Sequence, residues 1–173
     1  MTTSPTTPPV PDLLEVKLKA AGAAPVPVLW KRLDARALLP EYKTPGAAGL
    51  DLSACLPEGV GAMVIEPGRI MKVPLGFAIA LPPGFEAQIR ARSGLSASHG
   101  ITPVNAPGTI DSDYRGEVIV PLINLGRESF AVTHAMRIAQ MVIAPVSHAR
   151  LMVVEELDDT HRGAGGFGST GQH

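Results

Sequence analysis

Glycine and proline constrain this chain more than any other residues, because 18 glycines and 17 prolines together make 35 of its 173 residues. Average usage would supply about 12 % of a chain from these two types. Both residues serve turn positions and break the interiors of long helices. We therefore expect short strands separated by turns. The length, with 45% hydrophobic residues, fits one domain with a core.

Short apolar or alternating runs follow one another along the chain, separated by Gly, Pro, Asp and Asn. They predict strands at residues 26–30, 69–73, 77–81, 86–91, 117–124, 129–133, 138–146 and 151–157. Such regular spacing favours a sandwich, barrel or jelly roll over βαβ units.

Two local features refine this pattern. Pro121 lies inside the run at 117–124 and predicts an edge strand or a bulge there. The best helix candidate is short, SGLSASHG at 93–100, where Ser93 could cap the first turn and Gly100 could end the helix. The overall expectation is an all-β fold with one short helix.

The two ends differ in composition from the middle. We expect a disordered tail at 1–25, a β domain at 26–157 and a flexible, glycine-rich C-terminal arm at 158–173. The start of the chain lacks the pattern of a secretory signal, and no apolar run is long enough to cross a bilayer, so no membrane partner is expected.

Charge and cysteine content narrow the class of protein further. The formal net charge is -1 and the pI is near 6.5, so no global positive field favours nucleic acid as a partner. Cys55 is the only cysteine, which rules out an intrachain disulfide framework and any multi-cysteine metal site. A cytoplasmic protein is the simplest interpretation.

Two segments, at residues 44–54 and 89–101, carry the first candidate functional groups. Asp51, in TPGAAGLDLSA (44–54), could hold a hydrated Mg²⁺, which takes few protein ligands, or could be an ordinary carboxylate at a strand entry. In IRARSGLSASHGI (89–101), Arg92 precedes Ser93 and Gly94 at a helix start. Backbone N–H groups, a hydroxyl and a guanidinium suit an anion, although Arg-Ser-Gly also occurs in solvated turns.

The richest segment is NAPGTIDSDYRGE (105–117). Asp111 could act as the general base that activates a water, and Tyr114 offers a flat face for a sugar or base. The alternative is structural, with Asp111 and Asp113 capping a hairpin turn.

In MRIAQMVIAPV (136–146), strand alternation predicts Arg137 and Ala139 on one face, with Ile138 and Gln140 on the other. If Gln140 is buried it needs a hydrogen-bond partner, which could be a substrate or, more commonly, the backbone.

The C-terminal string RGAGGFGSTG (162–171) is not a P-loop, because GK[ST] is absent and no helix can follow. Arg162 for phosphate charge, Phe167 for stacking, and Ser169 with Thr170 for phosphate oxygens would make an arm that closes over a nucleotide.

These five segments, in this order, resemble the five motifs of the trimeric dUTPases, over about Val26 to Gly171. The resemblance implies a distorted jelly roll or β-sandwich of the β-clip type. It also implies a homotrimer whose active sites are shared by three chains, with Mg²⁺ as cofactor. The implied reaction is hydrolysis of dUTP to dUMP and pyrophosphate, which keeps uracil out of DNA and supplies dUMP for thymidylate synthesis.

The resemblance also implies individual roles. Uracil is recognised by Asn105 and the main chain of Gly108, Thr109 and Ile110, Tyr114 lies against the deoxyribose, and Asp111 deprotonates the attacking water. The phosphate ligands are Arg92, Ser93, Gly94, Gln140, Arg162, Ser169 and Thr170, while Gly166, Phe167 and Gly168 complete the closing arm. Asp51 holds the metal's waters.

In this scheme three chains contribute to each site. Asp51, Arg92, Ser93, Gly94 and Gln140 come from one subunit, residues 105–114 from a second, and the arm from a third.

The sequence departs from the family pattern at two places and leaves two rival functions. Ala91 stands where the family often has Pro, and HAMRIAQ (134–140) replaces the usual Gly-Asp turn. The rivals are a dCTP deaminase-like enzyme of the same fold and a non-catalytic nucleotide-binding regulatory module. The string IDSDYRGE and the glycine arm fit the hydrolase better, and the presence of Asp111 argues against the non-catalytic module.

Overall fold

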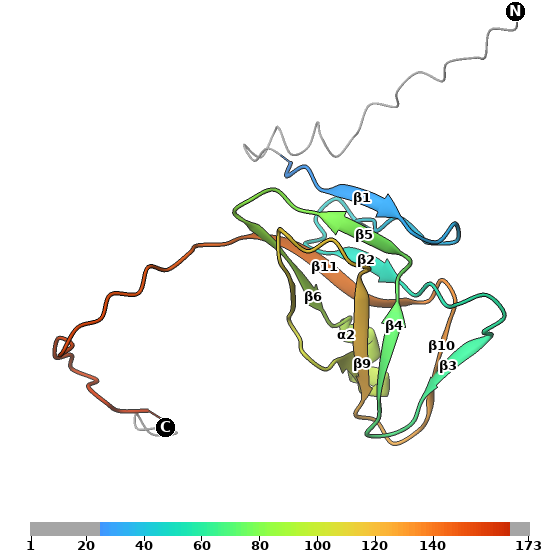
Figure 1. Ribbon diagram of the computed structural model, residues 1–173. Coiled ribbons are helices and arrows are strands. Elements are labelled where there is room, and N and C mark those ends of the chain that lie inside the picture. Colours follow the sequence, from blue (N-terminus) through green and yellow to red (C-terminus); the bar gives the residue numbers. More distant parts are fainter. Residues whose placement is uncertain (1–24, 167–173) are drawn as a thin grey trace, which may run out of the picture.

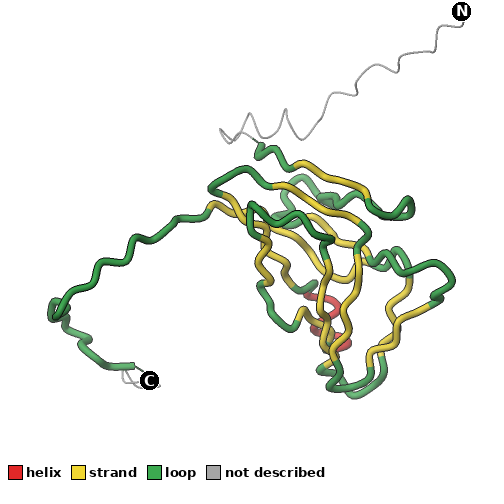
Figure 2. Tube along the Cα trace, in the orientation of Figure 1, coloured by secondary structure: helices red, strands yellow, loops and turns green. Residues whose placement is uncertain are grey.

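Short strands and tight turns build almost all of the structure, as the glycine and proline content predicts. The computed structural model describes residues 25–166, and within that range it contains eleven strands and one helix (Figures 1 and 2). The elements are β1 (Leu29–Arg32), β2 (Leu50–Ser53), β3 (Ala62–Ile65), β4 (Ile70–Pro74), β5 (Phe77–Ala80), β6 (Phe85–Arg90), α2 (Ser93–His99), β7 (Ile101–Pro103), β8 (Gly108–Ile110), β9 (Ile119–Asn124), β10 (Phe130–Thr133) and β11 (Arg137–Pro145).

The strands form antiparallel sheets. One sheet has four strands in the order β2-β11-β6-β8, and another has three in the order β4-β9-β7. Two further pairs, β1 with β5 and β10 with β3, complete the described strands. The predicted all-β jelly-roll class is thereby confirmed, with the predicted short helix beside the sheets (Figure 1).

Alternating side chains from these sheets fill one hydrophobic core. Ala87 and Ile89 point inward from β6, while Val120 and Leu122 point inward from β9, and all four are 5% exposed or less. Phe77 is fully buried between the sheets. Removing these apolar surfaces from water is the main driving force for holding the sheets face to face.

Pro121 corrects one expectation, because β9 is a central strand rather than an edge and pairs with both β4 and β7. Alternate residues of an antiparallel strand direct their backbone groups to opposite neighbours. The Pro121 carbonyl accepts a hydrogen bond from the Val104 N–H at 2.8 Å, just past the end of β7 at Pro103. The missing N–H of Pro121 therefore falls where the neighbouring strand stops, which is why a proline fits here.

The strand predicted at 151–157 is also wrong. The chain leaves the sheets after the Val146 N–H donates to the Gly84 carbonyl, and residues 147–157 then run away from the body (Figure 1). Leu151 and Val153 are 91% and 101% exposed. The segment has the composition of a strand, but no strand of its own chain lies beside it within the described residues, and a strand needs a partner.

The helix prediction is correct in extent and wrong in its cap. Gly100 ends α2 in the left-handed region, with φ of 69°, and its N–H donates to the Leu95 and Ser96 carbonyls. Ser93 is not the capping residue, because it is already the first helical residue and Arg92 occupies the capping position without a side-chain bond to the helix. The chain enters the helix directly from β6, so its extended residue falls one place earlier.

Asn124 is the one polar residue of the described chain that is fully buried, and it holds together two turns at the end of the core. Its amide Nδ2 donates to the Ile65 carbonyl at 2.8 Å and the Glu128 carbonyl at 2.7 Å, while its Oδ1 accepts from the Gly126 N–H at 2.8 Å. One side chain thus connects β3, β9 and the turn that follows β9.

We predict that Asn124→Ala lowers the free energy of unfolding by about 3 kcal/mol, because it removes three hydrogen bonds and leaves buried backbone groups unpaired. The measurement is urea unfolding at fixed protein concentration. Ser129→Ala is the matched control, since it removes only the exposed bond from Ser129 Oγ to Glu66 Oε2 and should cost under about 0.5 kcal/mol. Equal effects of both variants would contradict the role assigned to Asn124.

Candidate functional site

Strand register brings three of the predicted residues together at one end of the four-stranded sheet. Asp51 on β2 lies opposite Gln140 on β11, and Gln140 lies opposite Arg90 on β6. Arg92 follows two residues after Arg90, at the start of α2. Residues that are far apart in the sequence therefore form one polar cluster.

Asp51 is the centre of this cluster. Its Oδ1 lies 3.3 Å from Arg92 Nε and its Oδ2 lies 2.7 Å from Arg137 Nη1. The Asp51 side chain is only 16% exposed, against 27% for Arg92 and 47% for Arg137. A carboxylate partly removed from water is stabilised here by two guanidinium partners.

Arg137 corrects the predicted alternation of β11. The register with β2 shifts between Arg137 and Ala139, where Ile138 is an extra residue on the β11 side. Ile138 and Ala139 are consequently both buried, and the Arg137 side chain reaches Asp51, which faces Gln140. A bulge re-aims the side chains before it. No site role was predicted for Arg137 from the sequence. The altered turn at residues 134–136 was the one signal that this part of the chain is unusual.

Gln140 finds the commoner of its two predicted partners, since its Nε2 donates to the Ala91 carbonyl at 2.8 Å. The acceptor is the backbone carbonyl of Ala91, so the bond does not depend on whether alanine or the usual proline stands at this position. A Cβ at Gly49 would lie 2.6 Å from Gln140 Oε1, so a larger residue there would displace the amide from its present position.

Ser93 and Gly94 lie in the first turn of α2, next to Arg92. Both are exposed, and a Cβ built on Gly94 would meet nothing within 4 Å. The backbone there is open to solvent and accessible to a ligand.

A second group of predicted residues lies in the segment around β8, residues 105–117. Asp111 and Tyr114 are exposed, and the Tyr114 hydroxyl donates to the Glu117 carbonyl at 3.0 Å. A hollow of about 190 Å³ lies beside them, with walls that include Thr109 and Ile110. Within the described chain the carboxylates of Asp111 and Asp113 make no hydrogen bond, so the side-chain caps of the structural alternative are not formed.

Asn105 covers Gly108 in the same segment. A Cβ at Gly108 would lie 3.0 Å from Asn105 Nδ2, so the glycine allows the amide to approach the main chain of β8. The predicted uracil-recognising residues are thus adjacent, although Asn105 and Thr109 themselves are exposed.

Asp111 and the cluster around Asp51 lie at opposite ends of β6. Gly108 is opposite Ile89 and Ile110 is opposite Ala87, so the chain reaches Asp111 near Glu86, whereas Arg92 lies beyond the other end of the strand. At about 3.4 Å per residue, the six residues from Glu86 to Arg92 span roughly 20 Å. One chain therefore does not place Asp111 beside Arg92.

The predicted arm is described only in part. Arg162 is exposed, and its Nε donates to the Gly165 carbonyl at 2.8 Å within a local turn. Gly166 is half-buried and ends the described range. Phe167, Gly168, Ser169 and Thr170 lie outside the described residues, and the arm's predicted role is not tested by the structure.

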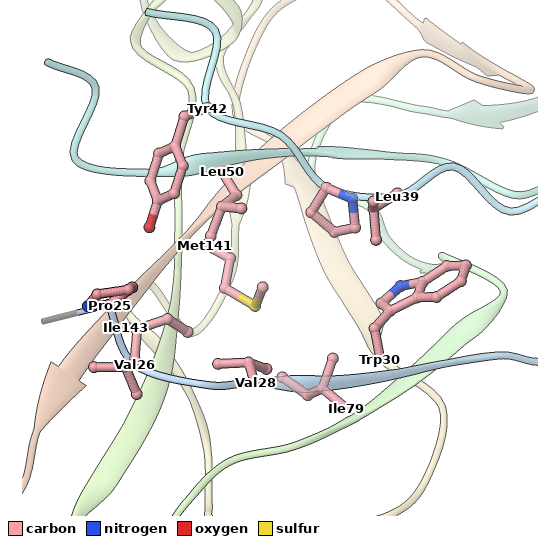
Figure 3. A pocket seen from close by; sticks show the side chains of 11 residues that line it. Pro25, Val26, Val28, Trp30, Leu39, Tyr42, Leu50, Ile79, Met141 and Ile143 are labelled. Atoms are coloured by element: carbon pink, nitrogen blue, oxygen red, sulfur yellow. The ribbon is translucent and has the colours of Figure 1, made fainter. Parts of the chain in front are cut away.

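A separate apolar pocket of about 380 Å³ lies between β1, β5 and β11 (Figure 3). Val28, Leu50 and Met141 face it, and its lining contains no carboxylate, histidine, lysine or arginine among the described residues. Trp30 Nε1 is buried there without a hydrogen-bond partner in the same part of the chain. This pocket lacks the groups that acid–base or phosphate chemistry needs.

Other candidate centres are also absent from the described part of the chain. Residues 25–166 contain no group of three or more His, Cys, Asp or Glu that could hold a metal ion. Burial raises the pKa of the Cys55 thiol, which keeps it protonated and disfavours a nucleophilic role. In the same range no helix is long and apolar enough to cross a membrane.

Comparisons with known proteins place these groups in context. The dUTPase family model matches residues 35–171. The chain is 60% identical to the deoxyuridine 5'-triphosphate nucleotidohydrolase of Desulfotalea psychrophila, over 77% of this chain and 87% of that protein. It is 55% identical to the enzyme of the same name from Maricaulis maris, over 84% and 97% of the two chains.

A solved structure gives the same result. The dUTPase of Staphylococcus bacteriophage 80alpha, in a structure with dUPNHPP, is 25% identical and superposes with a TM-score of 0.74 over 84% of this chain and 98% of that chain. The matched range contains Asp51, Arg92, Asp111 and Gln140, the residues that form the two groups described above. On sequence and fold together, this chain belongs to the dUTPase family.

Proposed function

We propose that this chain is a dUTP diphosphatase that hydrolyses dUTP to dUMP and pyrophosphate. The observation that carries the proposal is the family match over residues 35–171, which includes both polar groups of the structure. Curated relatives of 54–60% identity carry the name of this hydrolase. Neither rival from the sequence, a deaminase or a non-catalytic module, gains support from these comparisons.

The cluster around Asp51 supplies the phosphate-binding half of the proposed site. Arg92, the first turn of α2 at Ser93 and Gly94, and Gln140 present a guanidinium, N–H groups, a hydroxyl and an amide on one side of the sheet. Fixed donors of this kind stabilise the charge that develops on transferring phosphoryl groups. Ser93 favours departure of the pyrophosphate in this scheme.

The segment around β8, residues 105–117, supplies the nucleoside half. Asn105 and the main chain of residues 108–110 recognise uracil in our proposal, and Tyr114 packs against the deoxyribose. Asp111 takes the proton from the water that attacks the α-phosphorus. Its exposed carboxylate makes no bond within the described chain that would compete with such a water.

Mg²⁺ fits this site as an ion held mainly by the substrate. Asp51 is the only carboxylate of the phosphate-binding cluster, and both of its oxygens already face guanidinium groups. It can therefore contribute only through the metal's waters, which suits an ion that keeps several of them. When bound, Mg²⁺ neutralises charge on the triphosphate.

In our proposal the site is completed by other subunits of a homotrimer. Asp111 and Arg92 lie roughly 20 Å apart along β6, which supports a site whose base comes from one chain and whose phosphate ligands come from another. Residues 147–157 leave the body with large apolar side chains exposed, as a segment that crosses to a neighbour must. The C-terminal arm then closes over a third chain's site, through Arg162, Gly166, Phe167, Gly168, Ser169 and Thr170.

We propose the cytoplasm as the compartment, because the chain has a single cysteine and that cysteine is buried.

The base can be tested directly. We predict that Asp111→Asn retains dUTP binding, measured by calorimetry, but loses about two to four orders of magnitude in pyrophosphate release with Mg²⁺ present. Asp113→Asn is the matched control, because this carboxylate is exposed in the same segment and its loss should leave turnover near that of the wild type. Near-normal turnover in Asp111→Asn would assign the base to another residue.

The arm can be tested by shortening the chain. Truncation after Thr160 should lower pyrophosphate release by at least about 100-fold while leaving the melting temperature nearly unchanged, because arm contacts form only over the nucleotide. Truncation after Gly171 removes two residues outside the proposed site and serves as the control. A fully active protein ending at Thr160 would refute the closing arm.

The shared site makes a third prediction. Asp111→Asn chains and chains truncated after Thr160 are each inactive alone, but refolding them together should restore activity at about one site in four, because base and arm come from different subunits of a closed oligomer. Light scattering on the same mixture should give the mass of a trimer. If base and arm belonged to one chain, mixing would restore nothing.

A further inference from the structure

The Arg92 guanidinium is held on two of its three nitrogens. Nε faces Asp51 Oδ1 at 3.3 Å, and Nη1 donates to the Arg137 carbonyl at 2.9 Å. Among residues 25–166 the third nitrogen, Nη2, makes no hydrogen bond. The guanidinium is therefore fixed in orientation and keeps one end free for a ligand.

Arg137 holds this arrangement through both its backbone and its side chain. Its carbonyl accepts from Arg92, and its Nη1 lies 2.7 Å from Asp51 Oδ2, the oxygen that Arg92 does not use. Asp51 is thereby fixed between two arginines. The three residues form a closed set of contacts, which we call the Arg92 clamp.

The β-bulge in β11 makes the clamp possible. With regular alternation, Arg137 and Gln140 would lie on opposite faces of the sheet. The register shift between Arg137 and Ala139 instead brings the Arg137 side chain to Asp51, opposite Gln140. The turn before it has Ala135 at φ of 64°, with its N–H bonded to the Ala54 carbonyl at 2.8 Å.

The charges of the clamp suit a polyanion. Two guanidinium groups and one carboxylate leave a net positive charge, so the cluster remains attractive to phosphate. A long arginine side chain that is already ordered loses less conformational entropy when a ligand binds. The clamp therefore favours phosphate binding without adding a contact of its own.

We propose that Arg137 is a positioning residue for the reaction, and that it acts through Asp51 to hold Arg92 with its Nη2 end toward the substrate phosphates. This inference rests on the proposed function only in taking Arg92 as a phosphate ligand. Arg137 itself touches no substrate in this scheme, which separates its role from those of Ser93 and Gln140.

The experiment is a double-mutant cycle on pyrophosphate release from dUTP. Arg137→Ala should lower kcat/KM by about 10- to 100-fold, the scale of a misplaced catalytic group, with most of the loss in kcat. In an Arg92→Ala background the same change should have an effect of less than about twofold, because the residue through which it acts is gone. A general structural effect would lower activity equally in both backgrounds and would overturn the proposal.

Two further variants control for charge and folding. Arg36→Ala removes an arginine of similar exposure that lies outside the site, where its Nη2 is 2.6 Å from Asp34 Oδ2. This change should leave kcat/KM unchanged. If Arg137→Ala fails to fold, Arg137→Lys is used in the same cycle. It keeps the charge but not the guanidinium, so it should lose less than about tenfold, again only when Arg92 is present.

A readout independent of turnover separates this proposal from the proposed function. In the wild type, the Arg92 Nε–H proton should give a resolved NMR signal with slow solvent exchange, because it faces Asp51. Arg137→Ala should broaden that signal or move it to the position of free arginine, whereas Arg36→Ala should not. An unchanged Arg92 signal in Arg137→Ala would disprove the clamp even if the enzyme were active. A protein that does not hydrolyse dUTP but shows the signal change would refute only the proposed function.

Discussion

The hydrogen-bond ladders on both sides of β11 are the constraint on which the rest of this structure depends. This strand is nine residues long and pairs with β2 along one edge and β6 along the other. A slip of one residue in either ladder would turn every side chain to the opposite face of the sheet. This register places Asp51 opposite Gln140 and directs the end of β6 toward Arg92.

Sequence reasoning succeeded where local pattern alone determines structure. The runs at 77–81 and 138–146 are strongly apolar and became β5 and β11, and the serine- and glycine-bounded run became α2. It missed β2, β3, β7 and β8, because a run of three or four residues is too short to establish a strand without its pairing partner. It also misplaced the face of Arg137, since a bulge is decided by pairing with a strand that is distant in the sequence.

Asp51, Arg92, Gln140 and Asp111 were all predicted as site residues, and the family resemblance also assigned Asp111 to a different subunit from the other three. What no local pattern shows is the pairing of β2, β11 and β6, which brings Asp51, Gln140 and Arg92 together, while Asp111 lies near the other end of β6. The two groups also differ in how many bonds hold their side chains in place. The cluster around Asp51 is connected by ion pairs and by a hydrogen bond to the backbone, whereas Asp111 and Tyr114 are exposed in the segment that follows β8. Preorganisation in this chain is therefore concentrated in the cluster to which the proposed function assigns the phosphates.

The exposed segment after β11 has a consequence for the life of a newly made chain. Until Leu151, Met152 and Val153 are covered, an extended apolar stretch with unpaired backbone is open to water. An unpaired extended segment of this kind is a template for pairing with other chains and so for aggregation. If the proposed homotrimer is what covers it, solubility of the free subunit would depend on how quickly it meets its own copies. A short segment that contributes nothing to the core of its own chain would then couple the fate of each chain to subunit encounter.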